Sequence, residues 1–196
     1  MGDIEARSLG TRKGVSFKAA KIDVLGCDVD LLVVGMFERD GINRPTGGAN
    51  QIDRALHGTL GRLREGRIFK GTMGETLILS STPAPIKANS LMLIGMGDDP
   101  GALPHSIGEL TANAMQTALR MGARSTACLL TWSERELPSN LVELTAEMMM
   151  KGVLRAVEGH DGHDRQPEME WFFDIRNGDA ARMADALERA LGKPSG

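Results

Sequence analysis

The sequence predicts an α/β fold, a three-layer α/β/α sandwich in which helices cover both faces of a mixed, mostly parallel sheet. Short apolar runs that end in glycine alternate along the chain with longer segments of helical spacing. The run SLMLIGMG at 90–97 is continuous and too short to span a membrane, so we expect it to be the buried central strand. The 196 residues, 41% hydrophobic, contain no internal repeat and predict one domain over 15–192 with a tail over 193–196.

The first strand of the sheet is expected to follow a loose N-terminal segment. Residues 1–14 show no apolar period and predict a loose N-terminal segment. The alternation VSFKA at 15–19 predicts a half-buried strand near a sheet edge. The apolar run DLLVVGMF at 30–37 predicts a second, more deeply buried strand.

The first predicted helix follows a loop over 41–49 that contains proline and glycine. Asn50 is placed to cap this helix. The apolar side of the helix consists of Ile52, Leu56, Leu60 and Leu63. The segment 76–80 then predicts a short strand, and Pro83 and Pro85 separate it from the central run.

The second long helix is expected to begin at a capping box formed by Ser106 and Glu109 and to end at Gly122. Its inward side comprises Ile107, Leu110, Ala114, Ala118 and Met121. The segment 125–132 predicts the next strand, the partner of the central strand in a right-handed βαβ unit.

The last third of the chain predicts a helix, a strand and a helix. Asn140 opens a helix whose buried residues are Val142, Ala146, Met149, Val153 and Val157. After a polar loop over 160–167, the alternation at 168–175 predicts a strand with one solvated face. Asp179 caps a final helix. The buried side and the end of that helix are formed by Met183, Leu187, Leu191 and Gly192.

Charge and composition exclude several classes of function. A formal net charge of -3 and a pI near 5.8 give no basic field, so we expect neither nucleic acid nor a membrane as a partner. The first ten residues have the features of neither a signal peptide nor an anchor, which predicts a cytoplasmic protein. Cys27 and Cys128 match no metal or redox spacing and are expected to be reduced and packed.

Three blocks of sequence resemble the N-terminal domain of the leucyl (cytosol) aminopeptidase family. They are DLLVVGMFE at 30–38, FKGTMGETLIL at 69–79 and LMLIGMGD at 91–98. The strand GARSTACLL at 122–130 fits the same order, so the likeness covers nearly the whole chain. The resemblance implies a macrodomain-like fold. Family members assemble as hexamers, so it also implies a homo-oligomer or a catalytic aminopeptidase subunit as partner.

In this family, peptide hydrolysis belongs to a separate C-terminal domain that holds two metal ions. No segment here resembles its metal-binding motifs, so the resemblance supplies no catalytic residue, no metal ligand and no cofactor. We therefore expect a stand-alone, non-catalytic domain that acts in assembly, regulation or partner binding. An independent hydrolase ranks last, because no nucleophile and base pair can be named. Met1 and the helix end at Gly192 favour a complete gene product.

The alternative is a macrodomain-like protein that binds a nucleotide or an ADP-ribose-like small molecule. By analogy with macrodomains, backbone amides at the carboxyl ends of the strands would cradle a phosphate. The candidate residues are Gly35, Gly47, Gly48, Gly95, Gly97 and Asp98. The competing interpretation is that these glycines only turn the chain. The sequence GMFER at 35–39 also lacks the asparagine-rich motif usual in macrodomains that bind ADP-ribose.

Histidines suggest two further sites, and the simpler interpretation is preferred for each. His160, Asp161, His163 and Asp164 are metal-ligand types, but adjacent residues in a loop rarely fix a coordination geometry, so no metal site is expected. His57 and His105 flank the glycine loops, where a surface or capping role is favoured over proton transfer.

Overall fold

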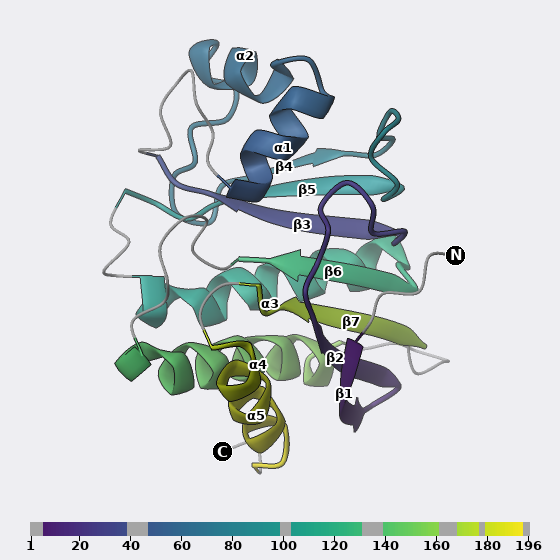
Figure 1. The fold of residues 1–196 in the computed structure, drawn as a ribbon, viewed down its shortest axis with the longest axis vertical. Helices are drawn as coiled ribbons and strands as arrows, with labels where there is room; N and C mark the ends of the chain where they lie inside the picture. The colour runs from purple at the N-terminus through teal and green to yellow at the C-terminus, as the bar shows by residue number, and fades with distance from the viewer. Residues whose placement is uncertain are drawn as a thin grey trace.

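One mixed sheet organises the chain (Figure 1), as a computed structural model shows for residues 6–38, 47–98, 103–130, 139–160, 168–176 and 179–193. The strands of these residues lie in the order β1-β2-β7-β6-β3-β5-β4. The two outer pairs are antiparallel and the four inner pairs are parallel, as predicted. The strands are β1 (Ala6–Arg12), β2 (Val15–Ala20), β3 (Leu31–Met36), β4 (Thr76–Leu79), β5 (Ser90–Gly95), β6 (Ser125–Leu129) and β7 (Met169–Asp174).

Helices cover both faces of this sheet and confirm the three-layer sandwich. One apolar core joins the sheet to the three helices that follow β5, and a second joins it to the connection 21–30 and to two shorter helices. Figure 1 shows the shorter pair at one end of the sheet and the longer helices toward the other. The helices are α1 (Gly47–Ala55), α2 (Thr59–Glu65), α3 (Leu103–Met121), α4 (Val142–Glu158) and α5 (Ala180–Leu191). No helix among the described residues is long and apolar enough to cross a bilayer.

The expectation that 90–97 forms the central strand is wrong. β5 is buried along its whole length but lies sixth in the order, between β3 and the edge strand β4. Helices above and below β5, together with the antiparallel β4 beside it, are sufficient to exclude water, so burial does not report position in the sheet. β6 is also not the direct partner of β5, because β3 lies between them.

Residues 6–14 of the predicted loose segment form a strand and a tight turn, in contrast to the prediction. β1 pairs antiparallel with β2, and Arg12 faces Val15 across a two-residue turn. Both turn residues, Lys13 and Gly14, have positive φ (46° and 78°), as tight hairpins require. An edge strand that buries only Leu9 shows no apolar period, which explains why the sequence did not reveal it.

Several helix boundaries differ from those predicted. α1 begins at Gly47, so Asn50 lies inside it and the predicted loop over 41–49 ends earlier. The chain breaks between α1 and α2 at His57 and Gly58, both with positive φ, although Ile52, Leu56 and Leu60 are buried as expected. α3 begins at Leu103 rather than at a Ser106 cap, and Met121, at its last turn, is 42% exposed. Asn140 lies in a short 3-10 turn (Ser139–Leu141) that precedes α4.

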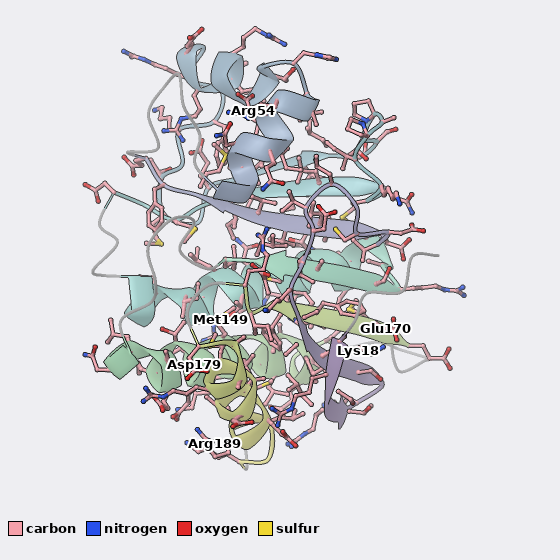
Figure 2. All side chains as sticks on the ribbon, in the orientation of Figure 1. Lys18, Arg54, Met149, Glu170, Asp179 and Arg189 are labelled. Carbon is pink, nitrogen blue, oxygen red and sulfur yellow. The ribbon has the colours of Figure 1, made fainter. Side chains whose placement is uncertain are left out.

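β7 joins the two ends of the sequence. It pairs in parallel with β2, and an ion pair links Lys18 with Glu170, which Figure 2 labels near each other. The prediction of one solvated face is wrong here, because Phe172 and Asp174 are buried along with Trp171 and Phe173. Both faces of β7 lie under other elements, since the connection 21–30 covers the side that alternation assigned to solvent.

Candidate functional site at the carboxyl edge of the sheet

The candidate site lies where the parallel strands end. In open α/β folds the carboxyl ends of the strands face the ligand crevice. β3, β5 and β7 all end at this edge, and α1 begins there after the segment 39–46, which lies outside the described residues. The structure brings the predicted Gly35, Gly95 and Gly97 to this edge, since β3 and β5 pair in register and Gly97 lies two residues after the end of β5.

The backbone amides of the last residue of β5 and of the two residues after it donate hydrogen bonds within the chain. Gly95 N–H donates to the Glu75 carbonyl at 2.7 Å, and Met96 N–H to the Met36 carbonyl at 2.8 Å. Gly97 N–H donates to the Gly71 carbonyl at 3.0 Å. A phosphate that used these three donors would have to break the bonds by which β5 is tied to β3 and to the turn before β4.

Close packing explains three of the predicted glycines. A Cβ on Gly95 would lie 1.9 Å from the Thr72 carbonyl oxygen, and one on Gly35 would lie 2.0 Å from the sulfur of Met96. Gly97 has φ +76°, and a Cβ there would lie 3.1 Å from the methyl group of Met73. Each glycine is thus required by the local fold, whether or not a ligand binds.

A carboxylate of the chain occupies an amide nest beside these glycines. Glu75 Oε2 accepts hydrogen bonds from the backbone N–H groups of Lys70 (2.8 Å), Gly71 (2.8 Å) and Thr72 (3.2 Å), and from the Thr72 hydroxyl (3.2 Å). Burial raises the pKa of Glu75, but the three amides outweigh it, so the pKa is lowered. Successive amides of this kind form an anion site, and here the anion is internal.

A positively charged side chain, Arg176, lies between the end of β7 and the start of α1. Asp174, fully buried at the end of β7, accepts from the N–H of Ile22 (3.1 Å) and from Arg176 Nε (3.0 Å). Burial raises the pKa of Asp174, while Arg176 opposes this shift. The Arg176 guanidinium reaches the start of α1, with Nη2 3.6 Å from the place of a Cβ on Gly48. A guanidinium beside a helix N-terminus is chemically suited to an anion.

The sequence did not single out Glu75, Asp174, Arg176 or Arg64. Arg64 is buried on α2 and donates to the carbonyl of Phe37 at 3.0 Å, which fixes the chain just after β3. The sequence pattern that could have indicated the burial of Arg64 is its spacing: it follows Leu60 by four residues and so lies on the apolar side of the helix.

The remaining predicted residues contribute little visible geometry. Asp98 is exposed at the last described position after β5, and Gly47 is the first residue of α1. The loop with Asp161, His163 and Asp164 lies outside the described residues. Within the described part of the chain, no group of three or more His, Cys, Asp or Glu side chains could hold a metal ion.

The sequence matches the cytosol aminopeptidase family, N-terminal domain, over residues 33–155. The chain belongs to the cytosol aminopeptidase family. A probable cytosol aminopeptidase from Ralstonia nicotianae is 26% identical over 176 residues, which are 90% of this chain and 33% of that protein. This chain therefore spans about a third of the length of that curated relative, and the matched part is a cytosol aminopeptidase N-terminal domain.

Solved structures confirm the fold of this cytosol aminopeptidase domain. A tomato leucine aminopeptidase mutant matches with a TM-score of 0.67 at 21% identity, over 90% of this chain and 35% of that chain. The Oceanobacillus iheyensis macrodomain with MES bound matches at 0.68 and 10% identity, over 95% and 98%. The Trypanosoma brucei macrodomain in complex with ADP-ribose matches at 0.63 and 17% identity, over 96% and 75%. The predicted macrodomain-like architecture is therefore correct.

Proposed function

We propose that this domain acts in assembly or partner binding for an aminopeptidase-type protein and supplies no catalytic group of its own. The observation that carries the proposal is that, among the described residues, the chain's own groups occupy the amide donors on the β5 side of the carboxyl edge. The amides of Gly95, Met96 and Gly97 donate to carbonyls, and Glu75 fills the adjacent nest. An edge built to hold a phosphate would keep such donors free for the ligand.

Family membership supports the same proposal. The resemblance implies that hydrolysis belongs to a C-terminal domain, and the curated relative is about three times as long as this chain. The N-terminal domain is then left with contacts to other chains or domains. A fold of this kind hosts many functions, so the proposal rests on the occupied amide donors beside β5 and not on the architecture alone.

The first test is an assay of the purified chain with leucine p-nitroanilide and added Mn²⁺ or Zn²⁺. We expect hydrolysis no faster than that of the metal ion alone, because no nucleophile, base or metal set is assigned to this domain. Saturable turnover with a bell-shaped pH profile would contradict the proposal and identify an independent hydrolase.

A second candidate function is the binding of an anionic small molecule such as ADP-ribose. The observation that favours it is the Arg176 guanidinium beside Gly48 and the start of α1. This side of the edge carries a positive group that Asp174 orients, whereas the β5 side is closed.

Calorimetry with ADP-ribose separates the two candidates. Arg176→Lys keeps the charge beside Asp174 but loses the planar fork, and Arg54→Lys on the exposed side of α1, labelled in Figure 2, is the matched control. The assembly role predicts no binding heat. Micromolar binding that weakens at least about tenfold in Arg176→Lys alone would favour the ligand instead.

A further inference from the structure

The edge strand β4 is mostly apolar and carries no charged residue. It contains Thr76, Leu77, Ile78 and Leu79, and it is the last strand in the order of the sheet (Figure 1). Among the described residues, β5 is the strand that pairs with it. Three of the exposed large apolar side chains, Ile68 (63%), Met73 (44%) and Ile78 (41%), belong to the stretch that leads into and through β4.

The opposite edge of the same sheet is protected. β1 carries Arg7 and Arg12, and its pairing is interrupted by a register shift between Ser8 and Gly10. α5 lies against it, and Arg7 forms ion pairs with Asp185 and Glu188 of that helix. Charges, bulges and covering helices are the means by which proteins prevent strand addition. Apart from its short length, β4 shows none of them among the residues that the structure describes.

The outward backbone groups of β4 follow from its pairing with β5. The backbone carbonyl of Glu75 accepts a hydrogen bond from Gly95 N–H, and Leu77 lies opposite Leu93 two residues further along. Because backbone groups alternate in direction along a strand, the N–H and C=O of Leu77 also point toward β5. The N–H and C=O of Thr76 and Ile78 therefore point away from the sheet. These four groups form a short ladder that a further antiparallel strand can complete.

We propose that the β4 edge pairs with the β4 edge of a second copy of this chain, in an antiparallel arrangement about a twofold axis. This inference rests on the assembly role proposed above and names the partner. The strand is complementary to itself: a register centred on Leu77 sets Thr76 of one copy opposite Ile78 of the other, and each such pair exchanges both hydrogen bonds. With no charged residue in β4, identical strands meet without repulsion.

Side chains on both faces support the same register. Leu77 is half-buried and packs on the α1 side of the sheet, and the register brings the Leu77 side chains of two copies together. Ile78 faces the other side and is partly covered by Thr76 of the second copy. The joined strands are short and bury less than the about 1,600 Å² of a standard interface, so we expect a dissociation constant on the order of 100 µM.

Sedimentation velocity of the whole chain over a concentration series tests the pairing. The wild type is expected to shift from monomer to dimer between about 10 µM and about 1 mM. Ile78→Lys places a charge in each of the two hydrogen-bonded pairs that flank the centre and should remain monomeric throughout. Thr11→Lys puts the same residue on an exposed position of the β1 edge and should dimerise as the wild type does. Thr76→Lys repeats the test if Ile78→Lys fails to fold.

Amide hydrogen exchange identifies the surface involved. The N–H groups of Thr76 and Ile78 should exchange at least about tenfold more slowly in the dimer than in the monomer. A wild type that stays monomeric, a dimer that survives in Ile78→Lys, or a dimer with unchanged exchange at Thr76 and Ile78 would each overturn the pairing. If the β4 pairing fails in this way while the chain neither hydrolyses leucine p-nitroanilide nor binds ADP-ribose, the assembly role stands and its partner is a different chain. Failure of the assembly role itself would instead appear as hydrolysis or as ADP-ribose binding, so the two failures are distinguishable.

Discussion

Glu75 holds three consecutive backbone amides through one carboxylate oxygen, and this arrangement fixes the turn that packs against Gly95. The contact is local in sequence, yet no helix or strand pattern announces it. The sequence singles out Gly95 and Gly97 beside this turn but not the carboxylate that holds it, because side-chain direction in a turn depends on φ values that composition does not fix.

Glu75→Gln should lower the free energy of unfolding by about 1 kcal/mol near neutral pH, because it replaces charge-assisted hydrogen bonds with neutral ones. The folded-state pKa of Glu75 lies below the usual 4.5, so its stabilisation is present above that value and is lost as pH falls through the folded-state pKa. The difference between wild type and variant should therefore persist down to about pH 4.5 and shrink as the pH falls further, in urea titrations.

The control for this prediction is Glu65→Gln at the exposed end of α2. It removes the same charge from the chain without touching the nest, and it should change stability little at either pH. Equal losses in the two variants would show that net charge, and not the nest, is responsible.

Elements were predicted with uneven success for physical reasons. Apolar runs and helical spacing indicate β3, β5, α4 and α5. Asp179, labelled in Figure 2, caps α5 by accepting a hydrogen bond from Arg182 N–H at 3.0 Å. β1 was missed because an edge strand buries few side chains. The order of β5 and β6 was beyond local patterns, since long-range pairing decides which strands become neighbours.

Two glycines set how closely α3 and α4 approach. A Cβ on Gly152 would lie 2.1 Å from the Gly108 carbonyl oxygen and 2.4 Å from the Thr111 hydroxyl, which itself bonds to the Met149 carbonyl of α4. Gly152→Ala should lower the free energy of unfolding by about 3 kcal/mol, because backbone must move to admit one methyl group.

Gly159→Ala provides the matched comparison at the end of α4. Its φ is -84°, and its nearest contact is 3.3 Å from the Arg155 carbonyl, so a change within about 1 kcal/mol is expected. Denaturant midpoints measured side by side decide the question. Similar midpoints for the two variants would mean that the helices can separate at no cost.

At the scale of the whole molecule, the reactivity of the two cysteine thiols measures whether both apolar cores exclude solvent. Cys27 and Cys128 are free, as predicted, and lie in different cores on the two faces of the sheet. Burial, with a smaller contribution from Asp23, raises the pKa of Cys27 to about 12, and burial raises that of Cys128 as well. Thiolate, the form that reacts, is therefore scarce in the folded chain.

Reaction with a disulfide reagent at about pH 8 should be slow for the native protein and should reach both thiols in urea. Cys27→Ala should reduce the urea endpoint to one thiol and leave the native rate low. Rapid labelling of the native chain would show that one face opens without global unfolding.

The parallel pairing of β2 with β7 has a consequence for the order of folding. β2 leaves the ribosome early, whereas its only parallel neighbour, Met169–Asp174, is made after most of the sequence. Contacts this distant along the chain carry a high entropic cost before they are formed. During synthesis the β1–β2 hairpin therefore has no sheet to join, and the central strands can assemble first around β3. The early hairpin is then added last, when β7 provides the edge that receives it.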